Sequence, residues 1–343
     1  MNQTSFQQSD FNEKSSSKKR FGLSLALIIL LLLGLLLLFD KSSTIIIEKQ
    51  SSWLKRASAL LTSKKGEEVN QQEELNKNFP MPEEEAGRLN VLILGIRGVD
   101  DPDGGLLTDS IMLFSFRDES KKASLTSIPR DLYIDLPGLF KGKANEIYER
   151  GLSKKDKTNF AKNSFSRISG IFIDKIVVFD FQGFKEIVDA LDGIDIVLEK
   201  PFEEKSQWGY EFSLSAGENH LDGQTALYYA RSRYSTNDFD RSRRQQEIIL
   251  AVKKKALSLG ILSNPVKITS LANSLKNNIS TDFNIWDTKN ILQLALTFNS
   301  AEKLQTKTIT TENLLYETAQ NNAYVLLPKN NDWNLIRNYF KQN

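Results

Sequence analysis

The sequence predicts a three-layer α-β-α sandwich with a mixed central sheet, preceded by one transmembrane helix. Two observations lead to this prediction. Residues 21–39 form a run of nineteen residues without a charged side chain, which is long enough to cross a bilayer as a helix. Beyond Leu89, short apolar runs that indicate buried strands alternate with segments of helical periodicity. This alternation is typical of layered α/β domains.

The apolar run from Phe21 to Phe39 predicts an uncleaved membrane anchor. As a helix it would be about 28 Å long, close to the hydrocarbon thickness of a bilayer. Basic residues precede the run, at Lys14, Lys18, Lys19 and Arg20, so we expect the N-terminus in the cytoplasm. A cleaved signal peptide is the alternative, but it would have a shorter apolar region and a small-residue cleavage site, which residues 39–42 do not offer. We therefore expect a single-pass protein of the cell membrane whose C-terminal domain is extracytoplasmic.

These patterns divide the chain into five parts. Residues 1–20 form a cytoplasmic tail, 21–39 the transmembrane helix, and 40–88 a stalk or linker that contains Pro80 and Pro82. Residues 89–260 form the main folded domain. Residues 261–343 form an extension of helices and a strand, packed on the same domain.

The secondary structure of the outer domain follows from local periodicity. Strands are expected at residues 89–95, 110–116, 123–128, 175–181 and 194–198, with an edge strand at 208–214. A helix at 183–191 lies between two of these strands and indicates a β-α-β unit. Further helices are expected from Asp222, as N-cap, to Tyr229 and from Arg241 to Leu259. In the extension, helices at 284–298 and 332–340 are expected around a strand at 303–310.

The composition excludes several classes of function. Cysteine is absent, so thiol catalysis, disulfides and cysteine-ligated zinc are excluded. The single histidine, His220, cannot build a histidine-rich metal site, and its position in a turn before a helix favours a structural role. Lys and Arg number 45 against 43 Asp and Glu. Nucleic acid is therefore not expected as a partner, and any anion site must be local.

Two loops that follow or border strands carry candidate functional residues. The glycine-rich loop 95–110 contains Asp100, Asp101, Asp103 and Asp109, whose carboxylates suit Mg²⁺. The alternative, which is the commoner explanation for such a loop alone, is an acidic turn in solvent. No Gly-Lys-Ser/Thr follows, so this is not a P-loop. Arg130 stands directly after a proline at a strand end, in a restricted backbone that can present its guanidinium group. A surface ion pair with Asp131 is the alternative.

The most cationic segment is 229–245, in which five arginines fall between Arg231 and Arg244. Projection on a helix places Arg241, Arg244 and Gln245 on the side of Ile248 and Val252, with Arg243 opposite. Arginine binds phosphate oxygens bidentately, and a helix N-terminus favours anions. We therefore expect a pocket for a di-anionic phosphate or a pyrophosphate, and a solvated run of charge is the alternative.

In this order behind one N-terminal anchor, the motifs resemble the LytR–CpsA–Psr family. The resemblance rests on segments 107–113, 127–131, 143–148, 188–194, 217–226, 229–233 and 238–245. It implies that residues 89–260 are the catalytic domain of a membrane-anchored phosphotransferase of cell envelope assembly. Such an enzyme moves a glycopolymer from a polyprenyl-pyrophosphate carrier to a sugar hydroxyl of peptidoglycan. Its partners would be the lipid-linked glycan, the peptidoglycan acceptor and the bilayer, and its cofactor Mg²⁺, with Mn²⁺ as an alternative.

The resemblance also implies roles for individual residues. Asp109 matches the family's metal-associated aspartate, and the pyrophosphate clamp is matched by Arg130, Arg231, Arg233, Arg241 and Gln245. The helix projection adds Arg244 to the clamp. Of these residues, we expect Asp109, Arg130, Arg231 and Arg233 to be catalytic.

The sequence departs from the family pattern in the first loop. Arg97 stands where an aspartate is common, and residues 106–108 lack an arginine that often precedes the aspartate. The second metal ligand could then come from Asp100, Asp101 or Asp103, between which the sequence does not choose. Asp101 is our candidate, with Asp109.

Two other functions fit the same residues. One is simple hydrolysis of a polyprenyl pyrophosphate, which needs no glycan acceptor. The other is non-catalytic binding of lipid or glycan by an envelope sensor. No sequence feature identifies a general base.

Overall fold

The computed structural model describes residues 67–342, except 100, 102–104, 155, 262, 263, 265, 268–272, 274–276 and 284–303. The chain divides into two units, residues 1–69 and 70–343, and the elements named below belong to the second. The expected transmembrane helix, Phe21–Phe39, and the expected helix at 284–298 lie outside the described residues. In the part of the chain that is described, no helix has the length and apolar character needed to cross a membrane.

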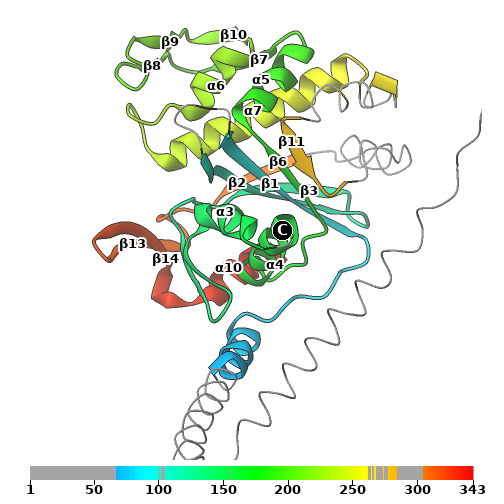
Figure 1. Ribbon diagram of the computed structural model, residues 1–343. Coiled ribbons are helices and arrows are strands. Elements are labelled where there is room, and N and C mark those ends of the chain that lie inside the picture. The colour runs from blue at the N-terminus through cyan, green and yellow to red at the C-terminus, as the bar shows by residue number, and fades with distance from the viewer. Residues whose placement is uncertain are drawn as a thin grey trace, which may run out of the picture. The chain divides into compact units, whose positions relative to one another are not determined.

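A six-stranded mixed sheet forms the centre of the second unit (Figure 1). Its strand order is β11-β6-β1-β2-β3-β12. The strands are β1 (Arg88–Gly98), β2 (Gly105–Arg117), β3 (Lys122–Ser127), β6 (Lys175–Phe179), β11 (Ile279–Thr281) and β12 (Leu304–Thr308). The pairs β1–β6 and β3–β12 are parallel, and the other three are antiparallel. The prediction of an α/β fold with a mixed central sheet is confirmed.

Helices cover both faces of this sheet. One face packs against α3 (Ile147–Leu152), α4 (Lys157–Ser169) and α10 (Trp333–Lys341), and the other lies under α5 (Phe181–Ala190), α6 (Gly223–Arg231) and α7 (Asp238–Ser258) (Figure 1). Strand β1 shows how both faces of the sheet are buried. Leu92 and Leu94 belong to the core with α3, α4 and α10, whereas Val91 belongs to the core beside Ile249 of α7. Successive side chains point to opposite faces, so a run of apolar residues fills both.

The expected β-α-β unit is wrong, because its second strand does not join the central sheet. Strand β7 (Ile194–Leu198) pairs instead with β10 (Gly217–Leu221) in a separate two-stranded sheet. Ile194 and Ile196 are buried while Asp195 and Val197 are exposed, which is the alternation of a strand with one solvent face. The expected edge strand at 208–214 is shorter. Only β9 (Phe212–Leu214) forms, and it pairs with β8 (Phe202–Glu204).

The folded unit begins earlier than the expected boundary at Leu89. Residues 70–78 are helical, and Leu75 and Phe79 are 3% and 5% exposed in the core that contains α4 and α10. The polar composition of this segment conceals these two apolar anchors, and burying them ties the end of the expected linker to the domain.

Two hairpins were not anticipated from local periodicity. They are β4 (Tyr133–Leu136) with β5 (Phe140–Lys143), and β13 (Leu315–Gln320) with β14 (Ala323–Pro328). The second hairpin is fastened to the segment after β3, since Leu326 N–H donates to the carbonyl of Asp131 at 2.9 Å. It therefore lies beside Arg130.

Side-chain caps fix where the helices around the site begin. Asp180, Asp222 and Asn237 accept a hydrogen bond from a backbone N–H in the first turn of α5, α6 and α7 respectively. Such caps satisfy N–H groups that have no partner inside the helix. The expected cap at Asp222 is thus confirmed. The short turn 232–237 between α6 and α7 brings the arginines of both helices together.

Candidate active site

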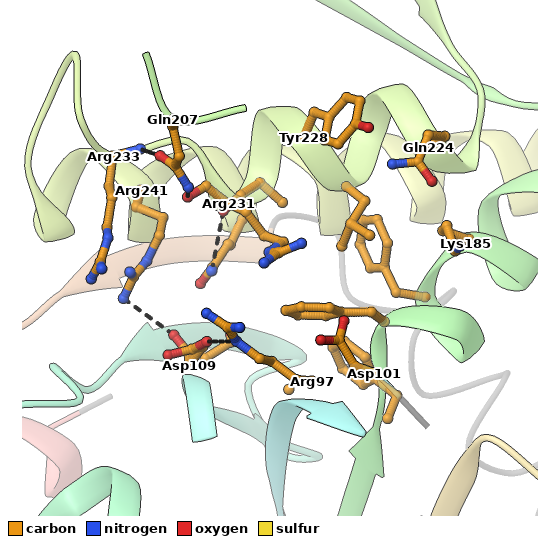
Figure 2. Close-up of a pocket in the computed structure, with 18 of the residues that line it drawn as sticks. Arg97, Asp101, Asp109, Lys185, Gln207, Gln224, Tyr228, Arg231, Arg233 and Arg241 are labelled. Atoms are coloured by element: carbon orange, nitrogen blue, oxygen red, sulfur yellow. Dashed lines mark hydrogen bonds and ion pairs between the residues drawn. The ribbon is translucent and has the colours of Figure 1, made fainter. Parts of the chain in front are cut away.

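A cavity of about 640 Å³ opens between one end of the sheet and helices α5, α6 and α7 (Figure 2). Strands β1 and β2 contribute Arg97 and Asp109, the segment after β3 contributes Arg130, and the ends of α6 and α7 contribute Arg231 and Arg241. Among the described residues, six cationic side chains and two carboxylates line this cavity. They are Arg97, Arg130, Lys185, Arg231, Arg233, Arg241, Asp101 and Asp109. The excess of positive charge makes this a site for a multiply charged anion.

A β-bulge places Asp109 in the cavity. Gly95 pairs with Ser110 and the next residue, Ile96, pairs with Thr108, so Asp109 is the extra residue between them. Bulges of this kind redirect a side chain out of the ladder. The Asp109 carboxylate accepts from Arg130 Nη1 at 2.7 Å and lies 3.8 Å from Arg97 Nε.

Arg130 is held by carboxylates on three sides. Besides Asp109, its Nε lies 3.2 Å from Asp238 and 3.5 Å from Asp131. Burial by itself lowers the pKa of Arg130, but the charges of Asp238, Asp109 and Asp131 outweigh it, so the pKa is raised. The ion pair with Asp131 that we named as an alternative is therefore present, and Arg130 nevertheless faces the cavity.

Arg231 is fixed by aromatic rings rather than by carboxylates. Its guanidinium carbon lies 4.0 Å from the ring centre of Phe181 and 5.0 Å from that of Trp208. Burial, followed by the charge of Arg97, lowers the pKa of Arg231, yet arginine stays charged at any physiological pH. Stacking on two rings leaves the edge of the fork available to an anion.

Arg241 is the most buried cation of the cavity, with 7% of its side chain exposed. Its Nη1 lies 3.2 Å from Asp238 and its Nη2 donates to the Asp109 carbonyl at 3.3 Å. Its Nε is buried and has no hydrogen-bond partner within the described protein. Burial lowers the pKa of Arg241, and the charge of Asp238 opposes that effect. An unpartnered donor at this depth is uncommon and points to a ligand.

The loop that carries Arg233 is held by two residues that sequence reasoning missed. Gln207 donates from Nε2 to the Arg231 carbonyl at 3.1 Å and accepts from the Arg233 N–H at 2.7 Å. Fully buried Glu204 accepts from the N–H groups of Tyr234 and Ser235. Both come from the β8–β9 region, which has no recognisable motif, so only their position after folding identifies them.

The side of the cavity toward α5 combines a few polar groups with apolar and aromatic side chains. Figure 2 shows Arg97, Arg231, Arg233 and Arg241 gathered at one end, and Tyr228, Gln224 and Lys185 toward the other. Apolar and aromatic side chains complete the lining: Met112, Phe179, Phe181, Phe184, Trp208, Leu227 and Ile249. A ligand with an anionic head and an apolar tail matches this division.

Comparisons with known proteins agree with this geometry. The LytR_cpsA_psr family model matches residues 44–341. The chain belongs to the LytR–CpsA–Psr family. The regulatory protein MsrR of Staphylococcus aureus is 33% identical over 236 residues, which cover 68% of this chain and 67% of MsrR. The polyisoprenyl-teichoic acid–peptidoglycan teichoic acid transferase TagV of Bacillus subtilis is 32% identical over 246 residues, 70% of this chain and 60% of TagV. The crystal structure of B. subtilis TagV, 28% identical, has a TM-score of 0.58 and matches over 75% of this chain and 97% of that one.

This member of the LytR–CpsA–Psr family brings most of its motif residues into one cavity. Asp101, Asp109, Arg130, Arg231, Arg233, Arg241 and Gln245 all line it. His220 lies elsewhere, on β10, with its Nδ1 2.6 Å from Asp195. Arg97, noted in the sequence only as a departure, is a lining residue as well. Where the resemblance led us to expect an aspartate, this chain thus presents a further cation to the site.

Arg244 does not take the position expected of a clamp residue. It is absent from the cavity lining, and its guanidinium group donates to the carbonyls of Tyr229 and Ser232 at the end of α6. It also packs on the ring of Phe202, at 4.9 Å. The helix projection correctly placed Arg244 on the buried side and Arg243 on the exposed side. It could not distinguish a side chain that enters the cavity from one that closes a neighbouring helix end.

The carboxylates give an incomplete set of metal ligands. Asp101 and Asp109 line the same cavity, but no three His, Cys, Asp or Glu residues of the described chain are grouped closely enough to hold a metal ion. Asp100 and Asp103 lie outside the described residues. Mg²⁺ typically binds one or two carboxylates and completes its shell with water and substrate phosphates. An ion held by these two aspartates would depend on water and substrate for its remaining ligands.

Proposed function

We propose that this protein is a membrane-anchored phosphotransferase that moves a glycopolymer from a polyprenyl-pyrophosphate carrier to a peptidoglycan sugar hydroxyl during cell envelope assembly. The observation that carries the proposal is the gathering of five guanidinium groups at one end of a cavity whose other side carries several aromatic and apolar side chains. A lipid pyrophosphate has the same division, a doubly charged head on an apolar chain.

The relatives support this substrate class. TagV is named as a transferase that joins teichoic acid to peptidoglycan, and a relative named TagU from Enterococcus faecalis is 33% identical over 219 residues. We extend the class of reaction to this chain and leave the glycopolymer unspecified.

The arginines would act through electrostatic stabilisation. Breaking a pyrophosphate develops negative charge on the bridging and equatorial oxygens, so fixed cations lower the barrier most. Arg231, stacked between two rings, and Arg241, with its unpartnered Nε, present donors in fixed orientations. Asp109 would orient Arg130 and Arg97, to which it is paired.

We further propose that Mg²⁺, or Mn²⁺ in its place, is held by Asp109 and Asp101 together with the substrate. Bound there, the ion would neutralise charge on the phosphate oxygens. With only two protein carboxylates, its affinity should rise markedly when a pyrophosphate is present. The residues at 21–39 would anchor the enzyme, with the active domain outside the cytoplasm.

The test uses full-length protein with a polyprenyl-pyrophosphate-linked glycan and Mg²⁺, with and without peptidoglycan. Replacing Arg231 and Arg233 together by alanine should lower donor turnover by about 10³-fold, since a single such donor is worth about 10²–10³. Arg243→Ala is the matched control, because Arg243 lies on the solvent-exposed face of α7 and pairs with Asp240.

The products separate the proposal from its alternatives. Glycan attached to peptidoglycan identifies the transferase, and released glycan phosphate alone identifies a hydrolase. Binding without turnover at every Mg²⁺ and Mn²⁺ concentration identifies a sensor. Undiminished turnover in the double variant would show that the clamp assignment is wrong.

A further inference from the structure

A second, smaller cavity of about 200 Å³ adjoins the first. Five residues line both cavities: Asp109, Ser110, Arg130, Arg241 and Gln245. We propose that this second cavity is the acceptor subsite, which binds the saccharide whose hydroxyl attacks the pyrophosphate. The inference rests on the proposed transferase function and adds where the acceptor lies and which residues hold it.

Two buried polar atoms on the shared wall lack a partner within the described protein. They are Ser110 Oγ and Arg241 Nε. Buried donors and acceptors nearly always find a hydrogen-bond partner, in the protein or in something bound to it. The Arg241 side chain is 7% exposed and lines both cavities, so its unpartnered Nε lies in the wall that they share. Donor phosphate and acceptor hydroxyl would meet where the two cavities adjoin, at these shared residues.

The β13–β14 hairpin forms the outer rim of the second cavity. Glu317 is paired with Leu326, and Tyr324 with Ala319, so the alternation along each strand puts Glu317, Tyr324 and Leu326 on one face. All three line the cavity. Tyr324 is 49% exposed, and its hydroxyl donates to Glu317 Oε1 at 3.2 Å. The hairpin therefore presents an aromatic ring beside a carboxylate at the entrance.

The charge of this cavity differs from that of its neighbour. Asp131, Asp238 and Glu317 line only the second cavity. Burial, and then the charges of Glu317, Asp131 and Asp238, raise the pKa of Tyr324 to about 12. Such a rim repels the anionic donor and accepts hydrogen bonds from hydroxyl groups, while an exposed ring packs against the apolar face of a sugar. A saccharide fits this chemistry, and a second phosphate does not.

Transfer exchanges one phosphorus–oxygen bond for another, and Asp238 of this cavity would take up the proton. The acceptor hydroxyl oxygen forms a bond to the phosphorus that carries the glycan, and the bond from that phosphorus to the bridging oxygen breaks. The bridging oxygen leaves with the electron pair as polyprenyl phosphate. The hydroxyl proton passes to the Asp238 carboxylate and then to water. Asp238 is placed for this by Arg130 Nε and Arg241 Nη1, each at 3.2 Å.

The experiment measures donor and acceptor separately on the full-length protein. The probes are a polyprenyl-pyrophosphate-linked glycan and a soluble, uncrosslinked peptidoglycan fragment. Tyr324→Ala and Glu317→Gln should each raise the acceptor KM for transfer at least about tenfold, a loss of about 1.4 kcal/mol. Donor hydrolysis and donor Kd should stay within about twofold. Tyr316→Ala is the matched control, since Tyr316 is on the opposite face of the hairpin and bonds to Asn331.

Direct titration with the peptidoglycan fragment separates failure of this inference from failure of the proposed function. Binding to the wild type that Tyr324→Ala weakens, without any transfer, would support the subsite and contradict the transferase. No fragment binding, an unchanged acceptor KM in both variants, or an equal loss in donor hydrolysis would overturn the subsite. Glu317→Gln, a substitution at an exposed position, provides a readout if Tyr324→Ala does not fold.

Discussion

Glu204 tests how the turn 232–237, which carries Arg233, is held in place. The residue is fully buried on β8, and its carboxylate accepts from Tyr234 N–H at 3.0 Å, Ser235 N–H at 3.1 Å and the Ser235 hydroxyl at 3.0 Å. Glu204→Gln keeps the shape but removes the charge and turns an acceptor into an NH₂ donor. That donor then faces N–H groups.

The magnitude follows from these bonds. Hydrogen bonds to a charged group contribute about 1.5–3 kcal/mol each, and neighbouring bonds do not add fully. A net loss of about 3 kcal/mol in the free energy of unfolding corresponds to a Tm lower by roughly 6–12 °C for a domain of this size. Glu203→Gln is the control, because Glu203 is the adjacent residue and is exposed beside Lys205.

The stabilisation by the Glu204 carboxylate should depend on pH. Burial by itself raises the pKa of Glu204, but hydrogen bonds from Ser235, Ser206 and Tyr234 outweigh it, so the pKa is lowered. The stabilisation is therefore complete above the unfolded pKa, near about 4.3, and is lost as the pH falls through the lower folded value. Thermal denaturation followed by circular dichroism between about pH 7.5 and pH 3.5 measures this. Equal Tm values for Glu204→Gln and Glu203→Gln at neutral pH, or a gap to wild type that does not shrink in acid, would refute the reasoning.

Two further predictions concern residues around the clamp. Arg244→Lys should lower the free energy of unfolding by about 2–3 kcal/mol, because an ammonium cannot bond to the Tyr229 and Ser232 carbonyls as the guanidinium fork does. The donor Kd should change less than threefold. A large rise in donor Kd with little change in stability would instead show that Arg244 belongs to the clamp. Gln207→Ala removes both bonds that bracket Arg231 and Arg233 and should lower kcat/KM for the donor about tenfold. Its Tm should stay within about 3 °C, and Gln224→Ala, an exposed position on the cavity edge, serves for comparison.

Local patterns in the sequence predicted the parts of the fold whose signals are local. Strands β1 and β2 contain the continuous apolar runs Val91–Leu94 and Ile111–Phe114, and the cap at Asp222 starts α6 as expected. β7 was misplaced because a strand's sheet partner depends on the distant strand it meets. The polar Asp195 between Ile194 and Ile196 was the available signal.

The residues of the candidate site were likewise predictable only where they stand in a local sequence motif. Asp109, Arg130, Arg231 and Arg241 stand in dense motifs, and they converge in one cavity. Gln207, Trp208 and Lys185 also line it but come from segments without a motif. They could be found only after the chain had folded, since an isolated glutamine or tryptophan carries no signal of its neighbours.

The sequence by itself determined the family, the cationic character of the site and the identity of most residues around it, because these depend on residue types and their local spacing. Only the tertiary structure decided that Arg97 faces the cavity while Arg244 closes the end of α6, and that a C-terminal hairpin brings Tyr324 beside Arg130 and Arg241. These outcomes depend on contacts between residues far apart in the chain. Packing and strand register settle such contacts, and the periodicity of a single segment contains no record of them.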